Sequence, residues 1–150
     1  EDTQMNRQNY MKVEFTSRSE NEAFARVAVS AFITQLDPTL EELEDVKTAV
    51  SEAVTNAIIH GYENEDGVIY VACTLNGQTA SITVEDHGKG IPDVKLAMEP
   101  LYTSKPELER SGMGFTMMQT FMDSLDVQTT FGKGTTVTMT KTFQSSPADL

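Results

Sequence analysis

The sequence contains one cysteine, no tryptophan and few basic residues, with 11 Lys and Arg against 23 Asp and Glu and a formal net charge of −12. A single cysteine, Cys73, excludes an internal disulfide and a cysteine-based zinc site, and its alternation with apolar neighbours predicts a buried thiol. The acidic excess opposes direct binding to nucleic acid, because attraction to phosphate dominates that affinity. It is compatible with solubility or with a basic protein partner.

Long apolar runs are also missing. None approaches the ~20 residues needed to cross a bilayer, and residues 1–10 lack the basic start and apolar centre of a signal peptide. These absences predict a cytoplasmic protein that does not bind a membrane.

Several common catalytic motifs are absent. The stretch GKGTT has glycine where a Walker phosphate loop needs Ser or Thr after the lysine, and no G-x-G-x-x-G occurs. His60 and His87 lack metal-ligand spacing, and no G-x-S-x-G marks a serine hydrolase. The sequence therefore argues against zinc and acyl-transfer chemistry.

The length of 150 residues predicts one domain, since a chain of this size buries roughly two-thirds of its unfolded surface. Residues 1–10 are polar and unpatterned, and we expect them to be disordered, like the tail at 144–150. The domain then spans residues 11–143.

Hydrophobic periodicity predicts alternating strands and amphipathic helices. The expected strands lie at 12–16, 67–75, 78–86, 125–131 and 135–143. The expected helices lie at 19–36, 39–61 and 112–122, with a shorter one at 93–98 and an irregular loop at 99–111. Capping boxes at Ser19/Glu22 and Thr39/Glu42 begin the first two helices, and Asn76-Gly77 predicts a hairpin. This order predicts a two-layer α+β domain with a mixed, mostly antiparallel sheet and helices on one face.

Three polar features could support chemistry. Glu52, Asn56 and His60 share one stripe of the second helix, bordered by apolar residues, although a solvated helix edge would give the same pattern. Asp86 ends a strand, where its carboxylate could accept a hydrogen bond from an amine. Gly88 and Gly90 follow, and glycine lets the backbone turn sharply beside a flat ligand, or simply form a tight turn.

The third feature is SGMGF, which places Gly112 and Gly114 where a helix begins. Unpaired N–H groups at a helix start attract phosphate, and Arg110 could add a fixed positive charge. A helix merely entered through glycines remains an equal alternative.

The order of these features resembles the Bergerat-type ATP-binding fold shared by histidine kinases, Hsp90, gyrase B and MutL. Three stretches, RSENEAFARVAVSAFITQLDPT, SEAVTNAIIHGY and KPELERSGMGF, are similar to the anti-sigma F factors of sporulating bacilli, a family of serine kinases. That resemblance covers nearly all of residues 11–143. It implies a site for ATP or ADP with Mg²⁺.

The resemblance implies roles for individual residues. Asn56 would complete the Mg²⁺ site, and Glu52 would act as the catalytic base or orient the attacking hydroxyl. Asp86 would bind the adenine amino group, with Gly88 and Gly90 lining the base. Thr136 would lie beneath the base. The phosphates would meet a lid that comprises Arg110, Ser111, Gly112, Met113, Gly114 and Phe115.

The same resemblance implies two protein partners: a sporulation sigma factor held inactive, and a small antagonist that is phosphorylated on serine. It also implies a homodimer, formed through the first strand and helix. Arg26 is the only cation between Asn21 and Leu36, so we expect it either to contact a partner or to be a solvated residue.

Two alternatives stay open. The domain could be a binding module that uses nucleotide as a conformational clamp without phosphotransfer, although Glu52 beside Asn56 speaks against this. It could instead be a detached histidine-kinase catalytic domain acting in trans, since no helical hairpin with a phospho-accepting histidine precedes it.

Overall fold

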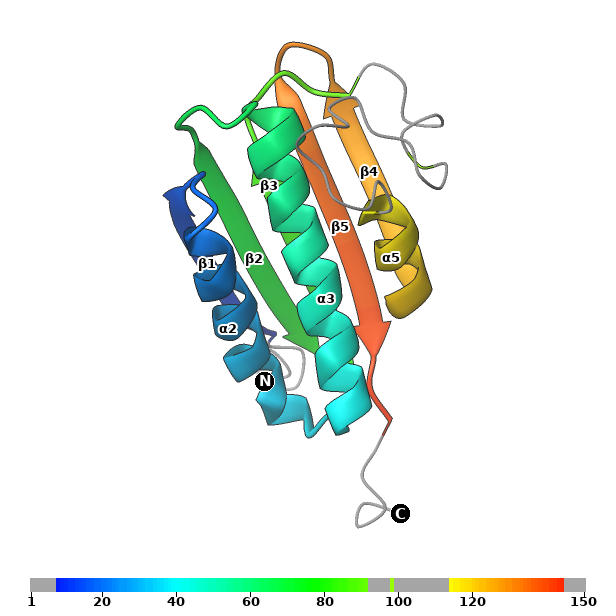
Figure 1. The fold of residues 1–150 in the computed structure, drawn as a ribbon. Coiled ribbons are helices and arrows are strands. Elements are labelled where there is room, and N and C mark those ends of the chain that lie inside the picture. The colour runs from blue at the N-terminus through cyan, green and yellow to red at the C-terminus, as the bar shows by residue number, and fades with distance from the viewer. Residues whose placement is uncertain (1–7, 92–97, 99–113, 145–150) are drawn as a thin grey trace, which may run out of the picture.

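The computed structural model describes residues 8–91, 98 and 114–144, and these form a five-stranded sheet in the order β1-β2-β3-β5-β4. The strands are β1 (Asn9–Thr16), β2 (Val68–Asn76), β3 (Thr79–Asp86), β4 (Ser124–Thr130) and β5 (Gly134–Thr142). Every neighbouring pair in the described sheet is antiparallel. Figure 1 shows one sheet face covered by α2 (Asn21–Ile33), α3 (Leu40–Asn56) and α5 (Gly114–Phe121). This confirms the predicted two-layer α+β architecture.

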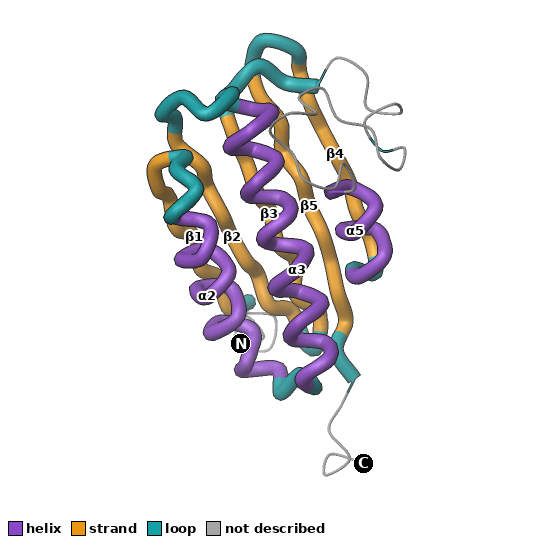
Figure 2. Tube along the Cα trace, in the orientation of Figure 1, coloured by secondary structure: helices purple, strands orange, loops and turns teal. Residues whose placement is uncertain are grey.

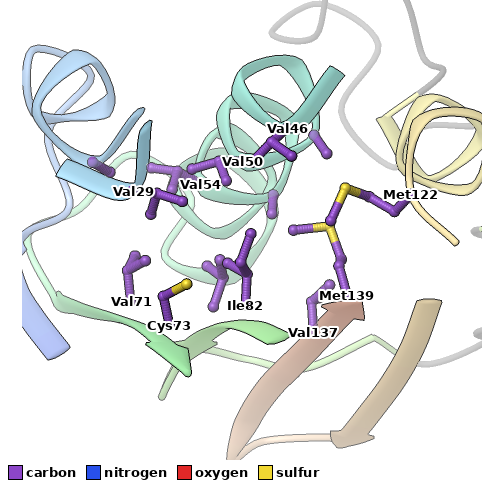
Figure 3. Packing of buried hydrophobic residues seen from close by; sticks show 14 of the residues in the cluster. Val29, Val46, Val50, Val54, Val71, Cys73, Ile82, Met122, Val137 and Met139 are labelled. Atoms are coloured by element: carbon purple, nitrogen blue, oxygen red, sulfur yellow. The ribbon is translucent and has the colours of Figure 1, made fainter. Parts of the chain in front are cut away.

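The core lies between the helices and the sheet, because side chains alternate across a strand and one face of each strand is apolar. Figure 3 shows valines of α2 and α3 pointing toward side chains of β2, β3 and β5. The fully buried residues of this core include Val29, Val50, Cys73, Ile82 and Met139. Burial raises the pKa of the Cys73 thiol to about 12, so this thiol stays protonated, as expected for a buried cysteine.

The first strand is longer than the sequence predicted. It begins at Asn9, and Asn9 and Tyr10 pair with Leu75 and Thr74 of β2. These two residues therefore belong to the sheet and not to a disordered segment covering 1–10. Their polar side chains do not show the apolar/polar alternation that predicts a strand. They belong to β1 because their backbone pairs with β2.

The first predicted capping box is wrong. Helix α2 begins at Asn21, two residues after Ser19, and its N-cap Glu20 makes no side-chain capping hydrogen bond. Glu22 pairs with Arg26 instead, at 3.1 Å between Oε2 and Nε.

The second predicted capping box is confirmed. The Glu42 N–H donates to Thr39 Oγ1 at 3.0 Å, and the Thr39 N–H donates to Glu42 Oε1 at 2.9 Å. Helix α3 therefore has a well-defined start, from which its polar stripe is positioned.

The predicted hairpin joins β2 to β3, with its loop one residue later than expected. Asn76 pairs with Thr79, so the two loop residues are Gly77 and Gln78. Gly77 has φ +63° and Gln78 has no positive φ, which suits a turn with glycine at its first central position. The predicted helix at 93–98 and loop at 99–111 lie outside the described residues, apart from Met98.

Three connections meet at one end of the sheet (Figure 2): the α3–β2 connection, the segment after β3 and the β4–β5 hairpin. Most of the polar residues identified from the sequence lie at or near this end. No helix among the described residues has the length and apolar composition needed to cross a bilayer.

Candidate functional site

The polar stripe of α3 lies at the border of the core. Glu52 and Asn56 are half-buried and one turn apart, whereas Ala53 and Val54 beside them are buried. The α-helix ends at Asn56 and continues as a π-helix, Ala57–Gly61. Wider π turns occur frequently at functional sites. Here the π turn directs the chain from Asn56 toward the end of β3.

Asp86 is the most buried acidic side chain of the described residues, with 6% of its surface exposed. Its Oδ1 accepts a hydrogen bond from the Gly88 N–H at 2.9 Å. Burial raises the pKa of this carboxyl, while backbone hydrogen bonds from Gly88 and Thr135 oppose the rise. The structure thus keeps one carboxylate in a mostly dry position with two backbone donors.

Three glycines pack so closely around Asp86 that a side chain at any of them would collide. A Cβ on Gly61 would lie 2.8 Å from Asp86 Cγ, and one on Gly134 would lie 2.1 Å from the Asp86 carbonyl oxygen. A Cβ on Gly88 would lie 2.1 Å from the Gly61 carbonyl oxygen. We call Gly61, Gly88 and Gly134 the glycine cradle.

In the sequence, Gly61 is only the last residue of the helix expected at 39–61. The feature that could have indicated its second role is its position directly after the polar stripe of α3. Gly90 also needs to be glycine, because its φ is +81° and a Cβ would lie 2.5 Å from the Thr130 carbonyl oxygen. It shapes the loop after Asp86 where that loop meets the β4–β5 hairpin.

Thr136, the threonine predicted beneath the base, and Asp86 lie on opposite faces of the sheet. Thr136 pairs with Glu85, whereas Thr135 pairs with Asp86. Side chains alternate along a strand, so Thr135 shares the helix-covered face with Asp86 and is only 5% exposed. Thr136 lines a cleft of about 340 Å³ with Glu85 and His87, and the same cleft is also lined by Asp86, Gly134 and Thr135.

Thr135 belongs to a small hydroxyl network next to Asp86. Its Oγ1 lies 3.0 Å from Thr129 Oγ1, which also contacts the Gly134 carbonyl oxygen at 3.1 Å. The Ile91 N–H donates to the same Thr129 hydroxyl at 2.8 Å. This network ties the loop after β3 to β4 and β5, and neither threonine was identified from the sequence.

Two of the predicted lid residues are described, and both are buried at the start of α5. Gly114 begins the helix, and Phe115 is 6% exposed and part of the core. The remaining lid residues, Arg110, Ser111, Gly112 and Met113, lie outside the described residues. Helix α5 packs against α3, so its start is anchored to the helix that carries Asn56.

Arg26 and Glu52 line the same cleft. This cleft, of about 160 Å³, lies between α2 and α3 and is also lined by Glu44, Lys47, Thr48 and Ser51. Arg26 forms an ion pair with Glu22 across one helical turn of α2.

Comparison with known proteins identifies the fold and the family. A family model described as the histidine kinase-like ATPase domain matches residues 15–141. The RsbU and RsbW domains of Rv1364c from Mycobacterium tuberculosis share the fold, with a TM-score of 0.64 at 19% identity over 90% of this chain and 32% of that one. Fold and site together define a histidine kinase-like ATPase domain of the Bergerat type, a class that binds nucleotide.

Sequence similarity narrows the class. The chain is 62% identical to the anti-sigma F factor of Clostridium kluyveri (strain ATCC 8527) over 137 residues, which is 91% of this chain and 96% of that protein. It is 64% identical to the anti-sigma F factor of Clostridium perfringens (strain SM101) over 134 residues, 89% of this chain and 96% of that one. The chain belongs to the anti-sigma F factor family.

Proposed function

We propose that this domain uses ATP and Mg²⁺ to phosphorylate a small antagonist protein on serine, and that it also binds and inhibits a sporulation sigma factor. The observation that supports the phosphotransfer best is the convergence of two elements. The glycine cradle holds the buried Asp86 carboxylate, and its Gly61 follows Asn56 by five residues along α3 and the π-helix. One nucleotide can therefore reach both.

Asp86 is suited to recognise the adenine amino group. A carboxylate has about four lone-pair positions, so it can accept from the backbone donors and still accept from a ligand N–H. Gly61 packs against the Asp86 carboxyl and Gly88 packs against Gly61, and neither adds a side chain that would obstruct a flat base. Thr135 would contribute its hydroxyl on the same face.

Asn56 is suited to a magnesium ion that is mostly coordinated by other ligands. Mg²⁺ prefers oxygen ligands and usually keeps several waters and phosphate oxygens, so one Asn side chain suffices. The described residues contain no group of three or more His, Cys, Asp or Glu that could hold a metal. When bound, the ion would neutralise charge on the phosphates.

Glu52 lies one turn before Asn56, half-buried at the border of the core. A carboxylate there can accept the proton of the attacking serine hydroxyl or orient that hydroxyl. General-base assistance is worth about 10²–10⁴-fold, whereas phosphoryl transfer depends mainly on positioning and charge stabilisation. Arg110 and the backbone N–H groups near Gly114 would meet the transferred phosphoryl group.

Arg26 is proposed to contact a protein partner, because it lines the cleft that reaches Glu52. The acidic surface fits a basic sigma factor, since complementary charge favours association. A homodimer is proposed through β1 and α2. Strand β1 is an edge of the sheet, and α2 next to it exposes Phe24 and Val27 at 50% and 60%.

The test is phosphotransfer to the antagonist protein of the same organism. Wild-type protein and Glu52→Gln are each mixed with γ-labelled ATP, Mg²⁺ and the antagonist, and the labelled residue is identified by mass spectrometry. We expect acid-stable label on a serine, lost in the variant. Tight ATP binding without label would favour a nucleotide-gated binding module, and acid-labile label would favour a histidine kinase.

A further inference from the structure

Tyr62 connects three parts of the candidate site through one hydroxyl group. It follows the π-helix directly, and its N–H donates to the Ala57 carbonyl at 3.0 Å. Its hydroxyl donates to the Val68 carbonyl at 2.6 Å, at the start of β2. The same hydroxyl accepts from the His87 N–H at 2.8 Å, directly after Asp86.

The two hydrogen bonds use the hydroxyl in both of its roles. A phenol has one hydrogen to donate and lone pairs to accept, so one orientation satisfies the carbonyl and the N–H together. Burial raises the pKa of Tyr62, so the phenol keeps its proton at neutral pH. Phenylalanine at this position would keep the ring and lose both bonds.

The ring is held as firmly as the hydroxyl. A Cβ on Gly67 would lie 2.3 Å from Tyr62 Cε1, so glycine is needed at 67 for the ring to lie against the backbone. The ring therefore has a fixed position between the start of β2 and the end of β3.

Gly61 and Tyr62 together hold the loop that follows β3. The Gly61 carbonyl accepts from the Lys89 N–H at 3.0 Å, and Gly61 packs against the Asp86 carboxyl. Tyr62 holds the peptide between Asp86 and His87. Two consecutive residues thus restrain the segment from Asp86 to Lys89.

We infer that Tyr62 is a positioning residue for base recognition: its hydroxyl fixes the Asp86–His87 peptide, so that the Asp86 carboxylate faces the exocyclic amino group of adenine. This inference rests on the proposed function, in which Asp86 binds that amino group. Tyr62 follows Asn56 by six residues. It therefore also links the part of the site proposed to bind the base to the part proposed to bind the phosphates.

The test compares ATP with purine riboside triphosphate, which lacks the exocyclic amino group, by isothermal titration calorimetry. The wild-type protein binds ATP more tightly. In Tyr62→Phe the ratio of the two affinities falls by about 3- to 10-fold, as expected when a hydrogen bond that positions Asp86 is lost. Affinity for purine riboside triphosphate stays the same, because the phosphate contacts are retained.

A control that also removes one hydroxyl is Thr142→Val. Thr142 pairs with Thr79 at the end of the sheet away from Asp86, and the two hydroxyl groups lie 2.8 Å apart. This control keeps the wild-type ratio. An unchanged ratio in Tyr62→Phe, with or without a lower melting temperature, would overturn the inference, because a purely structural role predicts that result.

Failure of the proposed function is recognised in the wild-type protein alone. Equal affinity for the two nucleotides would show that Asp86 does not read the amino group, and it would overturn both ideas before any variant is made. If Tyr62→Phe does not fold, hydrogen exchange of the wild-type protein decides. The His87 amide is expected to be protected, and exchange at the rate of an unstructured peptide would overturn the inference.

Discussion

Two adjacent threonines of β5, Thr135 and Thr136, lie on opposite faces of the sheet, so variants of the two test which face binds the nucleotide. Thr135 lies on the face of Asp86, and Thr136 lies on the opposite face beside Glu85. We predict that Thr135→Val weakens nucleotide binding and that Thr136→Val does not. Valine has nearly the same shape as threonine, so each variant removes a hydroxyl and leaves the volume unchanged.

The magnitude follows from the contacts that are lost. Thr135→Val removes the 3.0 Å contact with Thr129 Oγ1, whereas Thr129 keeps the Gly134 carbonyl and the Ile91 N–H as partners. No buried group is left without a partner, so the net cost is that of one hydrogen bond, about 0.5–1.5 kcal/mol. The proposed hydrogen bond from the Thr135 hydroxyl to the base is lost as well, and one such bond is worth about 2- to 12-fold in affinity.

Isothermal titration of ATP with Mg²⁺ into the two variants and the wild-type protein measures the difference. Thermal unfolding of the free proteins shows whether the hydroxyl affects folding instead of binding. If Thr136→Val weakens binding as much as Thr135→Val does, the base does not lie on the helix-covered face, and the assignment of the site to that face is wrong.

Three further predictions follow from burial and close packing. Gly61→Ala places a Cβ 2.8 Å from Asp86 Cγ, so titration should show weaker ATP binding, with a stability cost of about 1–3 kcal/mol partly offset by better helix propensity. Asp86→Asn should abolish ATP binding. Burial raises the pKa of Asp86 in the folded protein, so the folded state binds this proton more tightly than the unfolded state does. The resulting stabilisation is fully present below the usual carboxyl pKa and is lost as pH rises through the folded-state pKa. The stability of wild type relative to Asp86→Asn, measured by urea unfolding, should therefore improve as pH falls into that range. Met139→Ala, at a fully buried site, should cost about 2–5 kcal/mol in urea unfolding, whereas the control Leu40→Ala, 82% exposed, should stay within about 0.5 kcal/mol.

Much of the fold was predictable because its elements have strong local patterns. The Thr39–Glu42 capping box, the apolar face of α3 and the alternation in β2 and β3 each specify a structure within a short window. Asn9 and Tyr10 were missed because their place in β1 depends on pairing with β2. Ser19 was assigned wrongly because helix α2 begins two residues later than its pattern suggests.

The site was predictable in type and only partly in detail. Asp86 and Gly88 became candidates because a carboxylate and glycines after a strand form a recognisable pattern. The choice between Thr135 and Thr136 depends on strand register, which an almost uniform threonine run does not specify. Tyr62 and Gly61 act through contacts with residues about 25 positions later in the chain, and no local pattern indicates such contacts.

The most direct test of a single nucleotide site is the change in amide chemical shifts of the ¹⁵N-labelled protein when a non-hydrolysable ATP analogue and Mg²⁺ are added. We predict that the largest changes among the described residues occur at Asn56, Gly61, Gly88 and Thr135, from three separate segments of the chain. Changes confined to the cleft around Gln128 and Lys133, with Asn56 and Gly61 unaffected, would contradict the assignment of the nucleotide to the glycine cradle and the end of α3.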